Sequence, residues 1–195
     1  MHNSVTIKLV VFSVTAGQLD FYLTHGQLPS VTFIPGETLD HRVEDLLKTV
    51  STVQGYVEQL YTFSNPTEGG SDLIVTYFVL LPSKVGILGW ATWKNQTDPS
   101  VDFNIIRYAV KRLQWKIEYT NLAYSLLPSE FTLSDLQRVY EAILGRALDK
   151  RNFRKKILSL KLLKPTGNLK KGIKARPASI YQFLHRSPQI VKIFS

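Results

Sequence analysis

Two closely spaced helix signals in the last third of the chain limit its fold more than anything else in the sequence. Thr132 can accept a hydrogen bond from the following turn, and Asp135 stands where a capping box has its second partner. A stripe of apolar residues with helical spacing follows and ends at Gly145, which suits a left-handed turn. After a link of three residues, Asp149 can cap a second helix over about 150–160. This spacing predicts a helix-turn-helix unit.

The second helix has one apolar and one cationic face. At ~100° per residue, Phe153, Ile157 and Leu160 cluster on one side and should face a core. The other side and its flanks carry hydrogen-bond donors, namely Lys150, Arg151, Asn152, Arg154 and Lys155. Arginine forms a planar fork that fits guanine, and asparagine can pair with adenine in the same bidentate way. The pattern predicts the recognition helix of a DNA-binding module, and the alternative is an ordinary solvated basic helix.

A basic hairpin is expected after this helix. Residues 164–176 are polar and basic, and residues 178–183 have the composition of a strand. The cations that could contact phosphates or the minor groove are Lys164, Lys170, Lys171, Lys174 and Arg176. Such a hairpin is the wing of a winged helix-turn-helix domain over 129–195, and its presence makes the solvated-helix alternative weaker.

The net charge of +9 is divided unevenly along the chain. Residues 1–128 hold nine Lys and Arg against eleven Asp and Glu, a net charge of −2. Residues 129–195 hold fifteen against four, a net charge of +11, and no acidic residue follows Asp149. The positive field therefore belongs to the C-terminal region, where it can neutralise phosphates.

The first hundred residues predict a mixed α/β domain. The expected elements are strands over 5–23 (with a turn at 16–18), 31–34, 56–63, 72–81 and 89–93, and a helix over 40–52. Residues 64–71 are expected to form a polar loop. A helical stretch over 102–127, as one helix or two, would bridge to the winged helix. We therefore expect three regions, over 1–100, 101–128 and 129–195.

Several classes of site are excluded by composition. The chain has no cysteine, so disulfides, thiolate metal sites and cysteine nucleophiles are ruled out. The four histidines are scattered, with no pair at metal-ligand spacing. No P-loop and no Gly-x-Ser-x-Gly motif is present. No apolar run approaches the ~20 residues of a spanning helix, and a cytoplasmic location is the default expectation.

The C-terminal half resembles the Nudix-related transcriptional regulators of the NrtR family. The stretches that carry the resemblance are Arg112–Thr120, Leu126–Pro128, Phe131–Gln137 and Leu148–Lys156, and more loosely Phe33–Gly36 and Glu58–Phe63. The resemblance spans nearly the whole chain and is most specific from Arg112 to Lys156. The resemblance implies a Nudix-like α/β/α sandwich followed by a winged helix-turn-helix domain. It also implies a homodimer, an operator with two inverted half-sites, and control by ADP-ribose or another sugar or nucleotide metabolite.

The chain departs from a working Nudix box, whose core is Arg-Glu-x-x-Glu-Glu and which holds Mg²⁺ against a pyrophosphate. With Glu37 as the first glutamate of the box, Asp45 and Leu46 stand where arginine and glutamate belong. Residues 48–50 follow where carboxylates are required and supply none. Pyrophosphohydrolase activity is therefore expected to be absent, and we assign no catalytic residue, metal or required cofactor.

A few residues of the first hundred bear on a ligand site. Asp40 and Glu44 share a helix face and could hold a cation, although a solvated face is favoured. The loop over 65–71 lacks the arginines that the family commonly has there, so the effector could be a metabolite other than ADP-ribose. Four aromatic residues are expected to be core residues and not ligand contacts: Tyr61, Phe63, Trp90 and Trp93.

These patterns together predict a dimeric transcription regulator and not an enzyme. A winged helix would read palindromic DNA, and a catalytically inactive Nudix-like domain would sense a metabolite. Two alternatives remain at this point. One is a nucleoside diphosphate hydrolase with an unorthodox metal site, and the other is a module whose basic domain binds RNA or an acidic protein.

Overall fold

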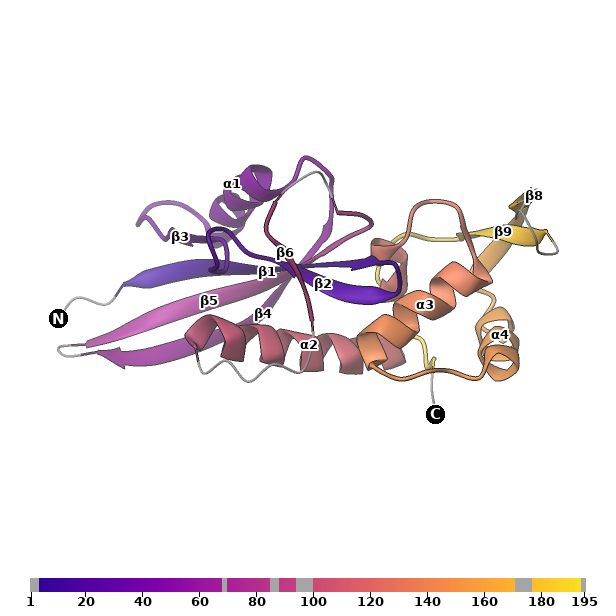
Figure 1. Ribbon diagram of the computed structural model, residues 1–195. Helices are drawn as coiled ribbons and strands as arrows, with labels where there is room; N and C mark the ends of the chain where they lie inside the picture. The colour runs from indigo at the N-terminus through magenta and orange to yellow at the C-terminus, as the bar shows by residue number, and fades with distance from the viewer. Residues whose placement is uncertain (1–3, 68–69, 85–87, 94–99, 171–176, 194–195) are drawn as a thin grey trace.

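The computed structural model describes residues 4–67, 70–84, 88–93, 100–170 and 177–193. A part built on a sheet and a mainly helical part lie side by side (Figure 1). In chain order the elements are β1 (Val5–Thr15), β2 (Gln18–Tyr22), β3 (Ser30–Thr32), α1 (Leu39–Val50), β4 (Tyr56–Thr67), β5 (Gly70–Leu81), β6 (Trp90–Thr92), α2 (Val101–Tyr119), the 3-10 helix η1 (Leu122–Leu126), β7 (Phe131–Thr132), α3 (Leu133–Leu144), α4 (Lys150–Ser159), β8 (Leu163–Lys170) and β9 (Ala178–Phe183).

The first part is an α/β/α sandwich, as expected. Its sheet has the order β4-β5-β1-β2-β6, with β3 also paired to β1, and α1 and α2 lie on opposite sides of it (Figure 1). Because successive side chains of a strand point to opposite faces, β1 serves both layers. Ile7, Leu9 and Val11 pack in the cluster on the α1 side, whereas Val10 and Phe12 pack in the cluster on the α2 side.

The structure decides one alternative that the sequence left open and overturns one prediction. The helical stretch predicted over 102–127 divides in two, because α2 ends at an extended Thr120 and η1 follows. The side chain of Asn121 explains the break, since it bonds to Ser187 O at 3.1 Å and accepts from Gln189 N at 2.7 Å. The predicted loop over 64–71 is mostly strand, and the β4–β5 ladder continues to its last pair, Thr67 and Gly70.

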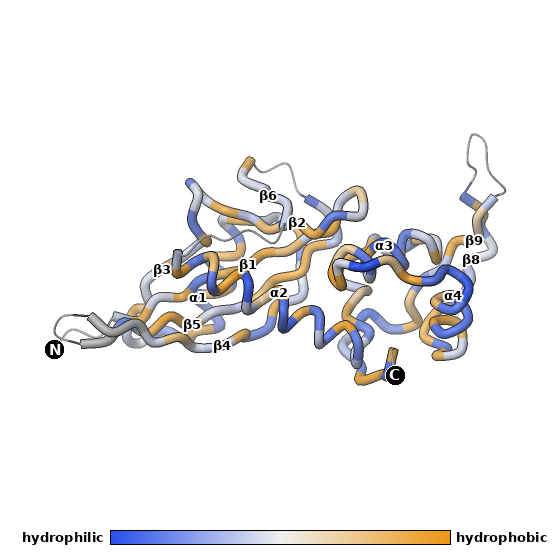
Figure 2. Tube along the Cα trace, turned by 60° about the horizontal axis from the view of Figure 1, so that its bottom comes forward, coloured by the Kyte–Doolittle hydropathy of each residue, from blue (hydrophilic) through white to orange (hydrophobic). Residues whose placement is uncertain are grey.

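One apolar core joins the sheet to the helical part. Phe78 of the sheet, Ile106 of α2, Leu136 of α3 and Phe153 of α4 all belong to a single buried cluster. The side-chain amide of Gln114 on α2 donates to a backbone carbonyl of α3, Ile143 O, at 2.9 Å. The expected bridge is therefore a packed element and not a free linker. Figure 2 shows the contrast between the apolar strands of this core and the hydrophilic α4.

The C-terminal segment returns from the wing to α2. Val191 N donates to Tyr119 O at 2.9 Å, and Ile193 N donates to Glu118 O at 2.8 Å. Ile193 is fully buried. This segment therefore fixes the wing to the bridge helix. None of the helices in the described part of the chain combines the length and the apolar character needed to cross a membrane.

Candidate nucleic-acid interface

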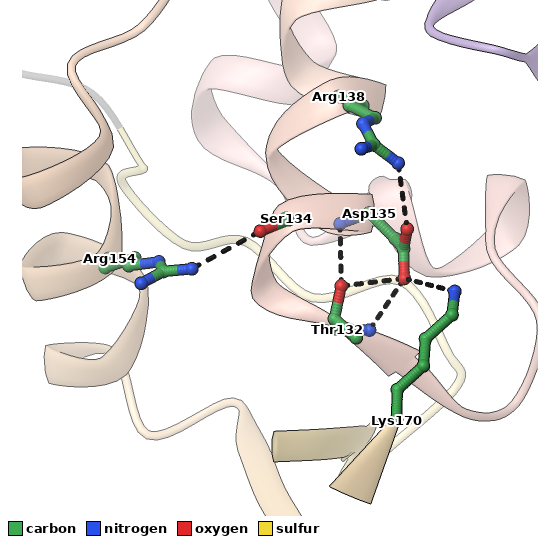
Figure 3. Close-up of polar contacts among 6 residues, drawn as sticks. All are labelled: Thr132, Ser134, Asp135, Arg138, Arg154 and Lys170. Carbon is green, nitrogen blue, oxygen red and sulfur yellow. Dashed lines mark hydrogen bonds and ion pairs between the residues drawn. The ribbon is translucent and has the colours of Figure 1, made fainter. Parts of the chain in front are cut away.

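The start of α3 is held by the capping box that the sequence predicts. Thr132 Oγ1 accepts from Asp135 N at 3.1 Å, and Asp135 Oδ2 accepts from Thr132 N at 3.0 Å (Figure 3). The same carboxylate lies 3.3 Å from Arg138 Nη1 and 3.7 Å from Lys170 Nζ of β8. Burial raises the pKa of Asp135, but the hydrogen bonds from Thr132 and the two cations outweigh it and hold this pKa below its ordinary value. Asp135 thus ties the helix start to the wing.

The turn between α3 and α4 is fixed by side chains to which the sequence analysis assigned no role in the turn. Gln137 is buried, and its side-chain amide donates to Glu141 Oε1 and to Leu148 O, both at 2.9 Å. Leu148 N donates to the same Glu141 oxygen at 2.9 Å. The helix itself ends at Gly145 in the left-handed conformation, with φ of 67°, as predicted. These contacts fix the angle between the two helices.

The apolar face of α4 packs as the helical wheel predicts. Asp149 caps the helix and accepts from Asn152 N at 2.8 Å. Phe153 and Ile157 are buried, and the Phe153 ring meets Tyr140 edge to face with centroids 5.4 Å apart. Burial raises the pKa of the Tyr140 phenol. The helix is therefore anchored by one side only, which leaves the other side available.

That other side carries exposed hydrogen-bond donors. Lys150, Arg151, Asn152 and Lys155 are all exposed. Leu158 is also exposed and shares a face with Arg151 and Lys155, because residues at spacings of four and three are neighbours on a helix.

Arg154 occupies a different position from these donors. It is half-buried, and its Nη2 donates to Ser134 Oγ of α3 at 3.3 Å (Figure 3). Its Nε is buried and has no hydrogen-bond partner among the described residues. Arg154 is placed to hold α4 against α3, and the sequence offered no signal for Ser134 as its partner.

The wing is a three-stranded sheet with the order β7-β9-β8. The strand β9 confirms the expected strand over 178–183, whereas the short β7 was not anticipated. Lys164 and Lys170 are exposed on β8. Three further wing residues of the sequence analysis, Lys171, Lys174 and Arg176, lie outside the described residues.

A groove of about 730 Å³ separates α4 and the start of α3 from the wing. Its lining includes the cations Lys150 and Arg154, the hydroxyls of Thr132, Ser179 and Tyr181, and no carboxylate among the described residues. Donors and cations of this kind are the usual contacts of sugar and phosphate oxygens. The groove therefore suits a nucleic-acid backbone next to α4.

A second hollow of about 350 Å³ lies in the sheet part, between α1 and β4. Its lining includes Asp40, Glu44, Glu58 and Tyr77, and no arginine or lysine among the described residues. Glu58 is already bonded to Lys116 and to the Tyr56 hydroxyl. In the described part of the chain, no group of three His, Cys, Asp or Glu side chains could hold a metal ion. The residues present do not fit the magnesium site of a Nudix hydrolase.

The four aromatic residues that were expected in the core fall into two groups. Phe63, Trp90 and Trp93 are partly buried and pack on the core clusters, in line with the expectation. For Tyr61 the prediction is wrong, because 52% of this residue is exposed. Its strand, β4, comes first in the sheet order, and no strand among the described residues pairs with its outer edge.

A comparison with known protein families matches the part of the chain that contains α4 and the groove. Residues 123–183 match the family model of the NrtR DNA-binding winged helix domain. In the structure, these residues contain the helix-turn-helix and the three-stranded wing described above. This match confirms the resemblance seen in the sequence, and it begins within η1, ahead of the boundary that we expected at 129.

Relatives extend the likeness to the whole chain. An "ADPR responsive transcriptional repressor NtrR" of Acinetobacter baylyi is 29% identical over 204 residues, covering 92% of this chain and 81% of that protein. Shewanella oneidensis NrtR in complex with a 27mer DNA is 26% identical, with a TM-score of 0.76, and the match covers 92% of this chain and 93% of that one. These names agree with a regulator and not an enzyme.

The fold of the sheet part is Nudix-like. A MutT/nudix family protein of Enterococcus faecalis has a TM-score of 0.68 at 19% identity, over 94% of this chain and 87% of that one. At this identity the likeness concerns the fold alone. Together with the NrtR structure, it confirms the predicted order of a Nudix-like sandwich followed by a winged helix.

Proposed function

We propose that this protein is a transcription regulator that inserts α4 into the major groove of operator DNA. The observation that carries the proposal is the anchoring of α4. Phe153 and Ile157 hold one side in the core, while Arg151, Asn152 and Lys155 are exposed on the other. An anchored helix with exposed bidentate donors is what direct base readout requires. The relative crystallised with DNA supports the same partner.

The residues of the interface take different roles in this proposal. Arg151, Asn152 and Lys155 would contact base edges, and Lys150 and Lys170 would contact phosphates. Arg154, which bonds to Ser134, would hold the helix at the correct angle. The wing cations Lys171, Lys174 and Arg176 would contact phosphates or the minor groove.

The proposed assembly is a homodimer on an operator of two inverted half-sites. Two winged helices related by a two-fold axis would place their α4 helices about one DNA turn apart, ~34 Å. Such a regulator acts in the cytoplasm. Ligand binding to the Nudix-like part would favour a dimer geometry whose spacing no longer fits the operator, and so would release the DNA.

The proposed effector is ADP-ribose, on the strength of the name of the Acinetobacter relative. The hollow between α1 and β4 is the candidate site. Asp40 and Glu44 line it and no basic residue is among its described lining, so this hollow offers no ion-pair partner to the two phosphates. Val57→Trp should fill this hollow. We expect it to abolish the release of DNA by ADP-ribose in a mobility-shift assay and to leave DNA affinity unchanged.

Selection from random duplexes tests the function directly. A palindromic consensus is expected, and Arg151→Ala should then weaken binding by ~1–3 kcal/mol and relax base choice at one position per half-site. The matched control is Lys48→Ala, which removes an exposed cation from α1 and should change neither property. Absence of enrichment would favour an RNA or acidic-protein partner. Turnover of a nucleoside diphosphate that Glu44→Gln abolishes would instead establish a hydrolase.

A further inference from the structure

One apolar side chain lies on the exposed face of α4. The helix contains three apolar residues, and two of them, Phe153 and Ile157, are buried in the core. The third, Leu158, is 45% exposed. At ~100° per residue, Leu158 lies within about 60° of both Arg151 and Lys155 around the helix. The face that is proposed to read bases therefore includes a leucine to which no role has been given.

The backbone that carries Leu158 is fixed by the end of the helix. Lys161 N donates to Leu158 O at 3.2 Å, and Leu160 N donates to Ile157 O at 3.3 Å. Lys161 takes the left-handed conformation, with φ of 53°, which turns the chain away from the helix. Since the neighbouring Ile157 is buried, position 158 is held in place while its side chain stays outside the core.

The surroundings of Leu158 restrict what can cover it. Its neighbours on the same face, Arg151 and Lys155, are exposed cations, and no acidic residue follows Asp149 in the sequence. A partner surface should therefore offer hydrogen-bond acceptors around one small apolar group. The major groove of DNA has this arrangement, because guanine and thymine present acceptor atoms there and thymine adds a methyl group on C5.

We propose that Leu158 contacts the C5 methyl group of a thymine in each half-site and is a specificity-determining residue. The inference rests on the proposed function, since it requires α4 in the major groove, and it adds the base that this part of the helix selects. Uracil lacks the methyl group, so the same contact would favour DNA over RNA.

The geometry of the helix locates this thymine. Leu158 lies seven residues beyond Arg151, which is ~10 Å along the helix axis. Base pairs stack ~3.4 Å apart, so the thymine should lie about three base pairs from the base that Arg151 contacts. Arg151, Lys155 and Leu158 follow one another at intervals of four and three residues. Base-contacting residues of the homeodomain recognition helix are spaced in the same way.

Duplexes in which deoxyuridine replaces one thymine per half-site test the contact. Uracil keeps the base pair and the O4 acceptor and removes only the methyl group. At one position, the wild-type protein should bind the substituted duplex about fourfold more weakly per half-site, as expected for one buried methyl group. This position should lie about three base pairs from the one at which Arg151→Ala relaxes base choice. Leu158→Ala should bind the thymine and uracil duplexes equally.

The control is Ile34→Ala, because Ile34 is an aliphatic residue of similar exposure, 47%, in the sheet part. This variant should keep the full response to uracil. Thermal unfolding of the same samples checks that Leu158→Ala is folded, and the uracil duplexes test the wild-type protein without any substitution in the chain.

Two results would overturn the inference while duplex binding itself persists. One is a wild-type protein that responds to uracil at no position of the half-site. The other is a folded Leu158→Ala variant that responds as strongly as wild type. Failure to select any duplex would instead refute the proposed function, and this inference with it.

Discussion

Replacing Asp135 with alanine tests whether the start of α3 holds the helix-turn-helix and the wing together. The change removes the acceptor of Thr132 N and the partner of Arg138 and Lys170. Losing the acceptor of the Thr132 hydroxyl costs about 1 kcal/mol, and leaving the N–H of the buried Thr132 without a partner costs about 1 kcal/mol more. Both cation side chains are 64% exposed, so the ion pairs together add at most about 0.5 kcal/mol.

The expected loss is therefore about 2 kcal/mol in the free energy of unfolding. For a chain of this length, each kcal/mol shifts the melting temperature by ~2–4 °C, so Asp135→Ala should melt about 4–8 °C below wild type at pH 7. Calorimetry at 0.15 M salt measures the shift. Arg138→Ala is the control, since it removes only one exposed ion pair and should shift the melting temperature by less than about 2 °C.

The pH dependence of this difference gives a second check. The pKa of Asp135 is lower in the folded protein than its ordinary value. Its contribution to stability is thus fully present above the unfolded pKa of ~3.9 and is lost as the pH falls through the folded pKa. The gap between wild type and Asp135→Ala should narrow below about pH 4. Equal shifts for Asp135→Ala and Arg138→Ala, or a gap that stays constant down to pH 3, would refute the reasoning.

Three further predictions concern α4 and the wing. Phe153→Ala removes a buried ring and should lower the free energy of unfolding by ~3–5 kcal/mol in denaturant titrations, and a loss under 1 kcal/mol would contradict the assigned anchor. Asp149→Ala removes the cap of α4 and should cost about 1 kcal/mol, with circular dichroism reporting any fraying. Lys170→Ala should weaken binding to all duplexes alike and reduce the slope of log affinity against log salt by about 1, whereas altered base preference would show that Lys170 reads sequence.

The winged helix could be predicted in detail because its signals are local. The cap at Thr132, the stop at Gly145 and the cap at Asp149 each depend on residues within one helical turn. The apolar and exposed faces of α4 followed from the helical period alone. For these elements, residues close in the sequence determine where each helix begins and ends.

Contacts between distant residues could not be predicted in this way. The end of α2 is set by bonds of Asn121 to Ser187 and Gln189, which lie more than sixty residues away. The helical wheel placed Arg154 on a flank of the donor face, but it could not show that Ser134 of α3 accepts a hydrogen bond from Arg154. The exposure of Tyr61 depends on strand order, and apolar alternation does not reveal which strand lies at the edge of a sheet.

The approach of α4 to DNA can be measured with a single thiol. Because the chain has no cysteine, Asn152→Cys introduces a unique reactive group on the exposed face of α4, and Lys48→Cys does the same on α1 as a control. A saturating palindromic duplex should slow maleimide modification at position 152 at least about tenfold and leave position 48 unchanged. Equal modification rates at position 152 with and without bound duplex would contradict insertion of this helix into the groove.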